Sequence, residues 1–428
     1  MGRFNCSVWV VFVGRTDSRC DKEAVMLWPV AVECAALFVA MAPFAIHRWN
    51  MRSWLARPHS TPTEAVSADL RVTVLLPVWN EASVIEGKLE NLAEQDLNVH
   101  LYLIDSASTD TTVNLARAWL KQNPEAFLSV TVDVMEARKG KSAAVSRALT
   151  ALPRGEHDLV CMTDADALLL PGALKRLQRW FADPMIGAVG ALPKREHARG
   201  EESQHRRMWE AMRIAESSID STPFLEGSCM MWRGRLVNEN DVVHYANADD
   251  AQIATAVRLK GLRVVVDPQA LFTDVAPLTL AGQRRQKIRR GQGLQRLLLR
   301  KRSTAGHASM GVFGRVFRRQ HHFHVVAPML VGVACAAGAL RWGLVGMFGW
   351  PAASTTAGQI HLFMGLMEAV VMLAWWSSRR GRPLGPLGLL GQWLTSMEWL
   401  LRSLLLLAKG QSLHMWEQHA EERLVMKE

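Results

Sequence analysis

Two aspartates separated by a single residue, Asp164 and Asp166, follow a short apolar run at residues 159–162. Such a run, with a turn soon after it at Pro171 and Gly172, predicts a buried strand. Carboxylates at the carboxyl end of such a strand face the crevice in which open α/β sheets bind ligands. Because carboxylate oxygens suit Mg²⁺ and Mn²⁺, and these ions carry phosphates, the pair indicates a site for a metal ion and a phosphate group.

Polar or aromatic residues also follow the three predicted strands upstream. They are Trp79 and Glu81 after the first strand, Asp105 at the end of the second, and Lys141 after the third. An aromatic ring can stack on a base, a carboxylate can accept hydrogen bonds from a nucleoside, and an ammonium group can neutralise phosphate. Each residue alone is as readily an ordinary surface residue. Four strand ends with these residue types in this order favour a nucleoside diphosphate site.

Two common nucleotide-binding motifs do not account for this pattern. Gly140-Lys141-Ser142 is like the end of a P-loop, but that motif needs a glycine five residues before its Gly-Lys pair, and the chain has Met135 there. No GxGxxG sequence follows the first predicted strand, which disfavours a dinucleotide-binding unit.

Strand-like and helix-like patterns alternate between the polar positions. Strands are predicted at 72–76, 99–104, 129–134 and 159–162, and helices at 82–94, 111–122, 141–149 and 173–181. This order predicts an α/β fold with a mostly parallel sheet and helices on both of its faces.

The charge distribution indicates a membrane rather than nucleic acid. The 428 residues carry a formal charge of +10, and no Asp or Glu occurs from Val275 to Met367. A basic block beside apolar segments marks the cytoplasmic side of a membrane. The aromatic residues lie mainly in the apolar segments, so no nucleic-acid partner is expected. The six cysteines show neither CxxC nor zinc spacing, which favours reduced structural thiols.

Apolar segments long enough to cross a membrane lie on both sides of the predicted α/β region. They cover residues 24–46, 325–350, 360–376 and 386–408. Basic residues follow the first, so its C-terminal end is expected in the cytoplasm. The last segment carries Glu398 and Arg402 at helical pairing distance, and it either crosses or lies in the interface. Ionisable residues within these segments, such as Glu33 and Glu368, either have a functional role or face neighbouring helices.

These patterns define a domain organisation. The predicted parts are an uncertain N-terminal extension at 1–23, a transmembrane anchor at 24–46, a linker at 47–68, an α/β domain at 69–302, an interfacial basic segment at 303–324, transmembrane or interfacial helices at 325–410, and a polar tail at 411–428. The chain is expected to be a multi-pass protein of the cell membrane with its α/β domain in the cytoplasm.

The ordered motifs resemble those of a known family. Pro-Val-Trp-Asn-Glu, Asp-Ser-x-Ser-Thr-Asp, Lys-Gly-Lys-Ser-x-Ala, Asp-Ala-Asp, Asp-Asp and Gln-x-x-Arg occur in this order between residues 71 and 298. This series is similar to that of family-2 glycosyltransferases with a GT-A fold, a Rossmann-like nucleotide-diphospho-sugar transferase domain. The membrane-bound members are most similar, such as the synthases of poly-N-acetylglucosamine, hyaluronan and cellulose, and lipid glycosyltransferases.

The resemblance implies a donor half of the site. Its residues would be Pro77, Trp79, Glu81, Asp105, Lys141, Asp164, Asp166 and Arg289. Trp79, in place of the usual Tyr, would lie against uracil, and Lys141 would approach the diphosphate. Asp164 would hold the nucleotide, and Asp166, with Asp164, would bind Mg²⁺ or Mn²⁺. The resemblance thus implies a nucleotide-sugar donor, with UDP favoured over GDP.

The resemblance also implies an acceptor half. Its residues would be Glu226, Gly227, Asp249, Asp250, Gln286 and Arg290. Asp250 would be the catalytic base that takes the proton of the acceptor hydroxyl. On the residues alone, Asp249 and Asp250 could instead cap the helix that follows them.

Arg290 stands where the family has Trp, so a stacking platform for a growing chain is not expected. Transfer of one sugar to a lipid or lipid-linked acceptor is therefore preferred over processive polysaccharide synthesis coupled to export. A catalytically inactive nucleotide-binding homologue is the third hypothesis.

Overall fold

A computed structural model of the chain describes residues 19–57, 61–63, 69–194, 201–274, 279–382, 384–413 and 415, without the side chains of 19–24 and 201–206. Most of the predicted N-terminal extension and polar tail, and part of the linker, lie outside these residues. The chain forms two compact units, Met1–Ala45 with Val326–Leu401, and Ile46–Val325 with Arg402–Glu428.

The second unit is built on an eight-stranded sheet. Its strands are β1 Arg71–Val78, β2 His100–Asp105, β3 Ser129–Val134, β4 Asp158–Thr163, β5 Leu168–Leu169, β6 Ile186–Pro193, β7 Cys229–Arg233 and β8 Arg263–Thr273. The order across the sheet is β3-β2-β1-β4-β7-β6-β8-β5. Strands β7 and β5 pair antiparallel with their neighbours, and the other pairs are parallel, so the sheet is mixed but mostly parallel, as predicted.

The helices of the described residues follow the predicted alternation and continue beyond it. They are α2 Arg19–Leu55, α3 Ile85–Ala93, α4 Thr112–Gln122, α5 Lys141–Ala151, α6 Ala173–Arg179, α7 Glu201–Ile219, α8 Asp249–Leu259, α9 Leu280–Lys301, α10 Gly311–His321, α11 Ala327–Phe348, α12 Thr356–Arg379 and α13 Gly388–Ala408. The predicted boundaries in the first half of the α/β domain agree with these to within about three residues.

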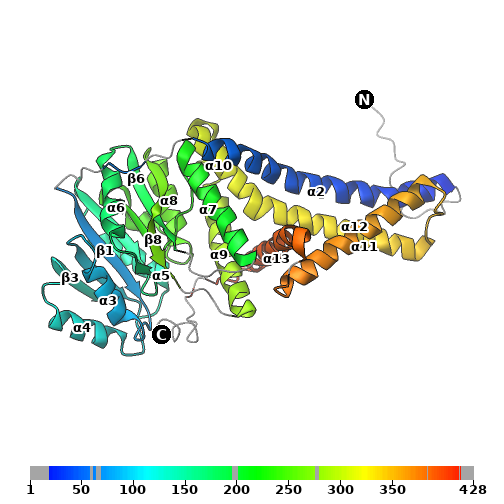
Figure 1. Cartoon of the computed structure of the whole chain (residues 1–428). Helices are drawn as coiled ribbons and strands as arrows, with labels where there is room; N and C mark the ends of the chain where they lie inside the picture. The colour runs from blue at the N-terminus through cyan, green and yellow to red at the C-terminus, as the bar shows by residue number, and fades with distance from the viewer. Residues whose placement is uncertain are drawn as a thin grey trace, which may run out of the picture. The chain divides into compact units, whose positions relative to one another are not determined.

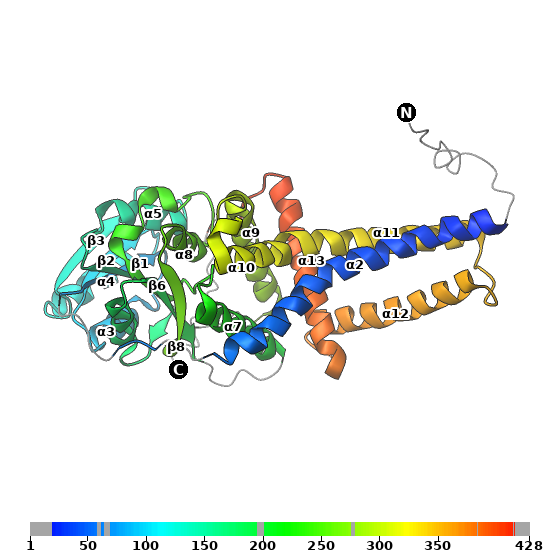
Figure 2. The same ribbon diagram turned by 90° about the horizontal axis from the view of Figure 1, so that it is seen from above.

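Alternation along β1 explains why both faces of the sheet are covered. Val74 and Leu76 pack in one apolar core with α3, α4 and α6, whereas Leu75 packs in a second core with α5 and α8. Successive side chains of a strand point to opposite faces, so a continuous apolar strand needs helices on both sides. Figure 2 shows α5 and α8 on one side of the sheet and α3 on the other.

Strand β7 brings a distant part of the chain to the metal-type aspartates. It pairs antiparallel with β4, with Cys229 opposite Thr163. The loop before β7 therefore lies beside the loop after β4. In consequence Glu226 and Gly227 meet the Asp164–Asp166 segment at the carboxyl edge of the parallel strands.

The first unit consists of long helices (Figure 1). Among the described residues, Val25–Leu55, Ala308–Phe348 and Thr356–Arg379 are long and apolar enough to cross a membrane, and α13 is not among them. Glu33, Arg341 and Glu368 come from three helices and form one cluster around the buried Arg341, with Arg341 Nη2 2.5 Å from Glu368 Oε1 and Nε 3.6 Å from Glu33 Oε2. Glu398 pairs with Arg379 at 3.2 Å.

Candidate active site

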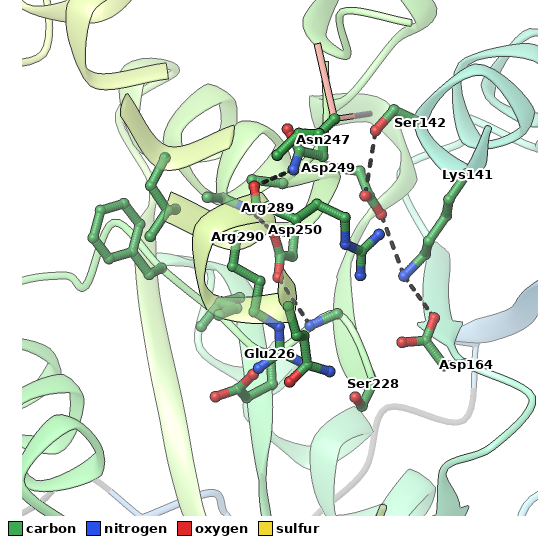
Figure 3. A pocket seen from close by; sticks show the side chains of 18 of the residues that line it. Lys141, Ser142, Asp164, Glu226, Ser228, Asn247, Asp249, Asp250, Arg289 and Arg290 are labelled. Carbon is green, nitrogen blue, oxygen red and sulfur yellow. Dashed lines mark hydrogen bonds and ion pairs between the residues drawn. The ribbon is translucent and has the colours of Figure 1, made fainter. Parts of the chain in front are cut away.

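A cavity of about 520 Å³ lies at the carboxyl edge of the sheet in the second unit. It is lined by ten of the predicted residues: Lys141, Asp164, Asp166, Glu226, Gly227, Asp249, Asp250, Gln286, Arg289 and Arg290. The structure thus brings residues of both predicted halves of the site, which are spread from Lys141 to Arg290 in the sequence, into one space. Figure 3 shows most of these side chains around the cavity.

Lys141 connects the two halves. It opens helix α5 directly after Gly140, whose φ of 87° suits glycine. Its Nζ lies 2.6 Å from Asp164 Oδ1 and 3.5 Å from Asp249 Oδ2. Burial alone would lower the pKa of Lys141, but the charges of Asp164 and Asp249 outweigh burial and raise the pKa above its ordinary value. The ammonium group therefore stays charged and can meet a phosphate.

Asp250 is a cavity-lining carboxylate whose surroundings change its acidity. It lies in the first turn of α8, where Oδ1 accepts from its neighbour's amide, and its Oδ2 accepts a hydrogen bond from Gly227 N at 3.2 Å. Burial, and next the charge of Asp249, raise the pKa of Asp250 to about 6. A carboxylate tuned toward neutral pH is suited to take a proton in the transition state.

Gly227 packs closely against the side chains of Lys141 and Asp250. A Cβ at residue 227 would lie 3.2 Å from Lys141 Nζ and 3.3 Å from Asp250 Oδ2. A side chain at residue 227 would therefore require both groups to shift by a few tenths of an ångström.

Helix α9 forms one side of the cavity. Asn247 Nδ2 donates to Arg289 O, and a Cβ at Gly293 would lie 2.8 Å from Asn247 Oδ1. The glycine lets α9 pack against the start of α8, which places Arg289 and Arg290 in the same cavity as Asp250 (Figure 3). Cationic groups at this position can stabilise a departing diphosphate.

Four predicted nucleoside contacts lie at the ends of β1 and β2 and outside the described lining of this cavity. They are Pro77, Trp79, Glu81 and Asp105. Val78 and Asp105 pair in the sheet, so these strand ends are adjacent. Asp105 Oδ2 accepts a hydrogen bond from Ser108 N at 2.9 Å. The guanidinium carbon of Arg138 lies 3.4 Å from the centre of the Trp79 ring. Their contact with a nucleoside stays a prediction.

Other lining residues were not predicted from the sequence. Arg213 on α7 forms an ion pair with Glu226, and Ser142 Oγ lies 3.4 Å from Asp249 Oδ1. No motif marks Arg213. Ser142, which directly follows Lys141 at the start of α5, could have been considered.

A second unpredicted feature is the segment after α13, of which Ser412, Leu413 and Met415 line the cavity. Gln292, which is fully buried, holds this segment with both ends of its amide. Its Nε2 donates to Gln411 O at 2.9 Å, and its Oε1 accepts from Leu413 N at 2.8 Å. Gln292 lies three residues after Arg289 on the same helix face, which was a usable signal; residues 411–415 gave none.

The acidic pair fits a divalent metal that the donor helps to hold. Among the described residues, no group of three or more His, Cys, Asp and Glu side chains is arranged to hold a metal ion. Mg²⁺ and the similar Mn²⁺ do not need such a cage, because they commonly bind one or two carboxylates together with substrate phosphates and water. Asp164 and Asp166 line a cavity that Lys and Arg side chains also line, and they could serve as such a partial ligand set.

Comparisons with known proteins agree with the geometry. Residues 69–293 match the family model described as "Glycosyltransferase like family 2". A poly-beta-1,6-N-acetyl-D-glucosamine synthase of Staphylococcus aureus is 25% identical over 240 residues, which cover 54% of this chain and 56% of that protein. The chain thus spans about half the length of that relative. An N-acetylglucosaminyltransferase of Rhizobium is 22% identical over 75% of this chain and 73% of its own length.

A solved structure extends the similarity to nearly the whole chain. A mannosyltransferase from Pyrobaculum calidifontis, in complex with GDP-mannose and Mn²⁺, is 26% identical, with a TM-score of 0.67. The match covers 90% of this chain and 98% of that one. Since the family model covers more than half of the chain, the chain belongs to glycosyltransferase family 2, and it is a glycosyltransferase with the GT-A fold.

Proposed function

We propose that the chain is a membrane-bound, inverting glycosyltransferase that moves one sugar from a nucleotide-sugar donor to a hydroxyl of a lipid or lipid-linked acceptor. The observation that carries the proposal is a single cavity that holds a carboxylate of raised pKa, Asp250, and a donor group of Lys141, Asp164 and Asp166. Asp250 can activate an acceptor, while the donor group can hold a leaving diphosphate.

The chemistry follows from these groups. The acceptor oxygen attacks the anomeric carbon in line with the bond to the diphosphate, so the configuration at that carbon inverts. Asp250 takes the hydroxyl proton as the new glycosidic bond forms. The bond between the anomeric carbon and the phosphate oxygen breaks, and Lys141 and Arg289 stabilise the charge on the departing nucleoside diphosphate. A divalent ion at Asp166 would supply further charge neutralisation to the diphosphate.

The donor is proposed to be a UDP-sugar, with GDP-sugars as the alternative. Val78, which precedes Trp79, pairs with Asp105, so an aromatic ring and a carboxylate come from adjacent strand ends, and this pair of groups would suit uracil. The mannosyltransferase of similar structure was solved with GDP-mannose, which keeps guanosine as the competing donor class.

Apolar residues on the acceptor side support a lipid acceptor. Leu406, Leu413 and Met415 at the C-terminal side, and Phe224 and Leu294, line the cavity that holds Asp250. An acceptor with a polar hydroxyl and an apolar chain could contact both Asp250 and the apolar residues that line the cavity.

Processive polymer synthesis is the second candidate, because one relative is named as a synthase of a polysaccharide. Arg290 lines the cavity at the position where the family has Trp. A guanidinium group there favours an anionic leaving group over a stacked sugar chain, so we rank single transfer first.

The catalytic unit is proposed to face the cytoplasm of a multi-pass protein. Basic residues Arg48, Arg52 and Arg57 lie at the C-terminal side of the first apolar stretch. A single cysteine at the exposed Glu94, in a chain whose other cysteines are replaced, should resist an impermeant maleimide in right-side-out vesicles. Labelling of this cysteine before detergent is added would show that the catalytic unit faces the opposite side of the membrane.

A donor panel tests the proposed reaction. Membranes with the full chain are incubated with UDP-sugars and GDP-sugars, with Mn²⁺, Mg²⁺ or chelator, and the products are identified by mass. We expect a lipid product heavier by one sugar, formed with a UDP-sugar and lost in chelator. A ladder of products would favour the polysaccharide synthase, and transfer undiminished in chelator would exclude the metal role.

A further inference from the structure

Helix α3 buries a lysine against the sheet. Lys88 lies on the same helix face as Ile85, Leu89 and Leu92, and like them it is essentially inaccessible to solvent. A charged group in a core is costly unless its hydrogen bonds are satisfied. The partners of Lys88 therefore indicate what the lysine does.

Those partners flank the Asp164-Ala165-Asp166 sequence. Lys88 Nζ donates to Thr163 Oγ1 at 2.8 Å and to the backbone oxygen of Ala167. One ammonium thus holds the residue before the aspartate pair and the residue after it. The acceptors are a hydroxyl and a carbonyl group, so the contact fixes the shape of the loop without occupying either carboxylate.

The contact continues to the acceptor half of the site. Thr163 Oγ1, which accepts from Lys88, donates to Ser228 O at 2.8 Å. Ser228 follows Gly227, whose amide binds Asp250. The direction of these bonds is consistent, because a hydroxyl that donates to Ser228 can still accept from an ammonium. A chain of hydrogen bonds therefore links α3 to both loops of the active site.

We propose that Lys88 is a positioning residue that fixes the loop from Thr163 to Ala167 so that Asp164 and Asp166 can hold a divalent metal ion with the donor diphosphate. This inference rests on the proposed function, in which these carboxylates are the metal ligands. Outer groups that orient metal ligands typically change metal affinity by about 10- to 100-fold when they are removed.

A simpler role is to fill space in the core. Methionine is unbranched and close to lysine in length, so Lys88→Met keeps most of the packing and removes the donor. If Lys88 only fills space, Lys88→Met leaves metal binding unchanged. If Lys88 only repels cations through its charge, the same change tightens metal binding. If Lys88 fixes the geometry of the loop, Lys88→Met weakens metal binding.

The test measures Mn²⁺ binding directly by electron paramagnetic resonance on the purified full chain, with saturating UDP and without turnover. Lys88→Met should weaken Mn²⁺ binding about tenfold or more. At saturating Mn²⁺, the kcat of Lys88→Met should return toward the wild-type value. The Mn²⁺ concentration that the variant needs for activity should stay higher than that of the wild type. Lys88→Arg, which keeps a donor, should restore part of the affinity. Lys121→Met, at an exposed position of α4, is the matched control and should bind as the wild type does.

Thr163→Val provides a second test that leaves Lys88 in place. It keeps the side-chain shape and removes the link to both Lys88 and Ser228, so it should also weaken Mn²⁺ binding severalfold. Wild-type Mn²⁺ affinity in Thr163→Val and in any folded Lys88→Met protein would overturn the inference. If the wild type itself shows neither Mn²⁺ binding with UDP nor transfer, the proposed function fails instead.

Discussion

The ammonium of Lys141 lies 2.6 Å from the carboxylate of Asp164, and it reaches Asp249, next to the proposed base, at 3.5 Å. One side chain therefore neutralises acids from both halves of the site. The negative charge that would otherwise gather between β4 and α8 is reduced, and the charge of Lys141 lowers the pKa of Asp250 against the raising effects of burial and of Asp249.

Removing this cation should shift the pH dependence of transfer. Lys141→Met takes away a charge that lowers the pKa of Asp250, so the acid limb of the kcat profile should move to higher pH. Donor KM should also rise, because the diphosphate loses a partner. Kinetics from pH 5 to 9 measure both effects. Lys175→Met on the exposed surface of α6 is the control, and an unmoved acid limb in Lys141→Met would contradict the electrostatic link.

The wild-type enzyme should itself lose activity in acid. Asp250 must be ionised to accept a proton, and its pKa is raised to about 6, so kcat should rise through about pH 6 and then level off. The folded-state pKa lies above the unfolded value, so the contribution of Asp250 to stability is largest in acid and is lost as pH rises through 6. Asp250→Asn should therefore melt at least as high as the wild type at pH 8. A melting temperature of Asp250→Asn below that of the wild type at pH 8 would contradict the view that the buried, ionised Asp250 destabilises the folded state.

The parallel half of the fold could be predicted because its signals are local. Short apolar runs, and polar residues where they stop, located β1 to β4 and the Asp164 and Lys141 positions. The register of β7 beside β4 could not be predicted, since pairing between distant segments leaves no periodic pattern in either. For that reason the meeting of Gly227 with Asp250 rested on a family resemblance and not on spacing.

Other features were missed because their sequence pattern resembles that of ordinary residues. Lys88 reads as a polar interruption of an amphipathic helix, and only the packed structure shows it enclosed. Gln292 reads as one more polar residue in a basic helix. Its two hydrogen bonds reach a segment about 120 residues away.

The segment held by Gln292 should control acceptor binding. Gln292→Leu removes both amide contacts and leaves the backbone groups of Gln411 and Leu413 without this partner. We expect acceptor KM to rise about threefold to tenfold, consistent with the loss of about 1 kcal/mol of positioning, while hydrolysis of the donor in the absence of acceptor is little changed. Gln122→Leu at an exposed end of α4 is the control. Equal losses of donor hydrolysis and transfer would contradict a role confined to the acceptor.

The charged cluster in the first unit should matter for stability rather than chemistry. Arg341 is fully buried between Glu33 and Glu368, and Arg341→Leu leaves two carboxylates without their cation. Breaking such a buried pair costs about 3 to 5 kcal/mol, whereas replacing all members together costs much less. The free energy of unfolding, measured in mixed detergent micelles, should fall strongly in Arg341→Leu. It should fall less when Glu33→Gln and Glu368→Gln are added to that variant. Equal stability of the single variant and the wild type would sink this account.

Comparison of the wild type with Asp250→Asn in a transfer assay tests the central claim most directly. With the full chain in membranes, the selected donor and Mn²⁺, product mass and release of nucleoside diphosphate are measured together with binding of the donor. The wild type should add one sugar to its acceptor, and Asp250→Asn should bind donor normally but transfer about 10²- to 10⁴-fold more slowly. Transfer by Asp250→Asn at the wild-type rate would contradict the assignment of the base.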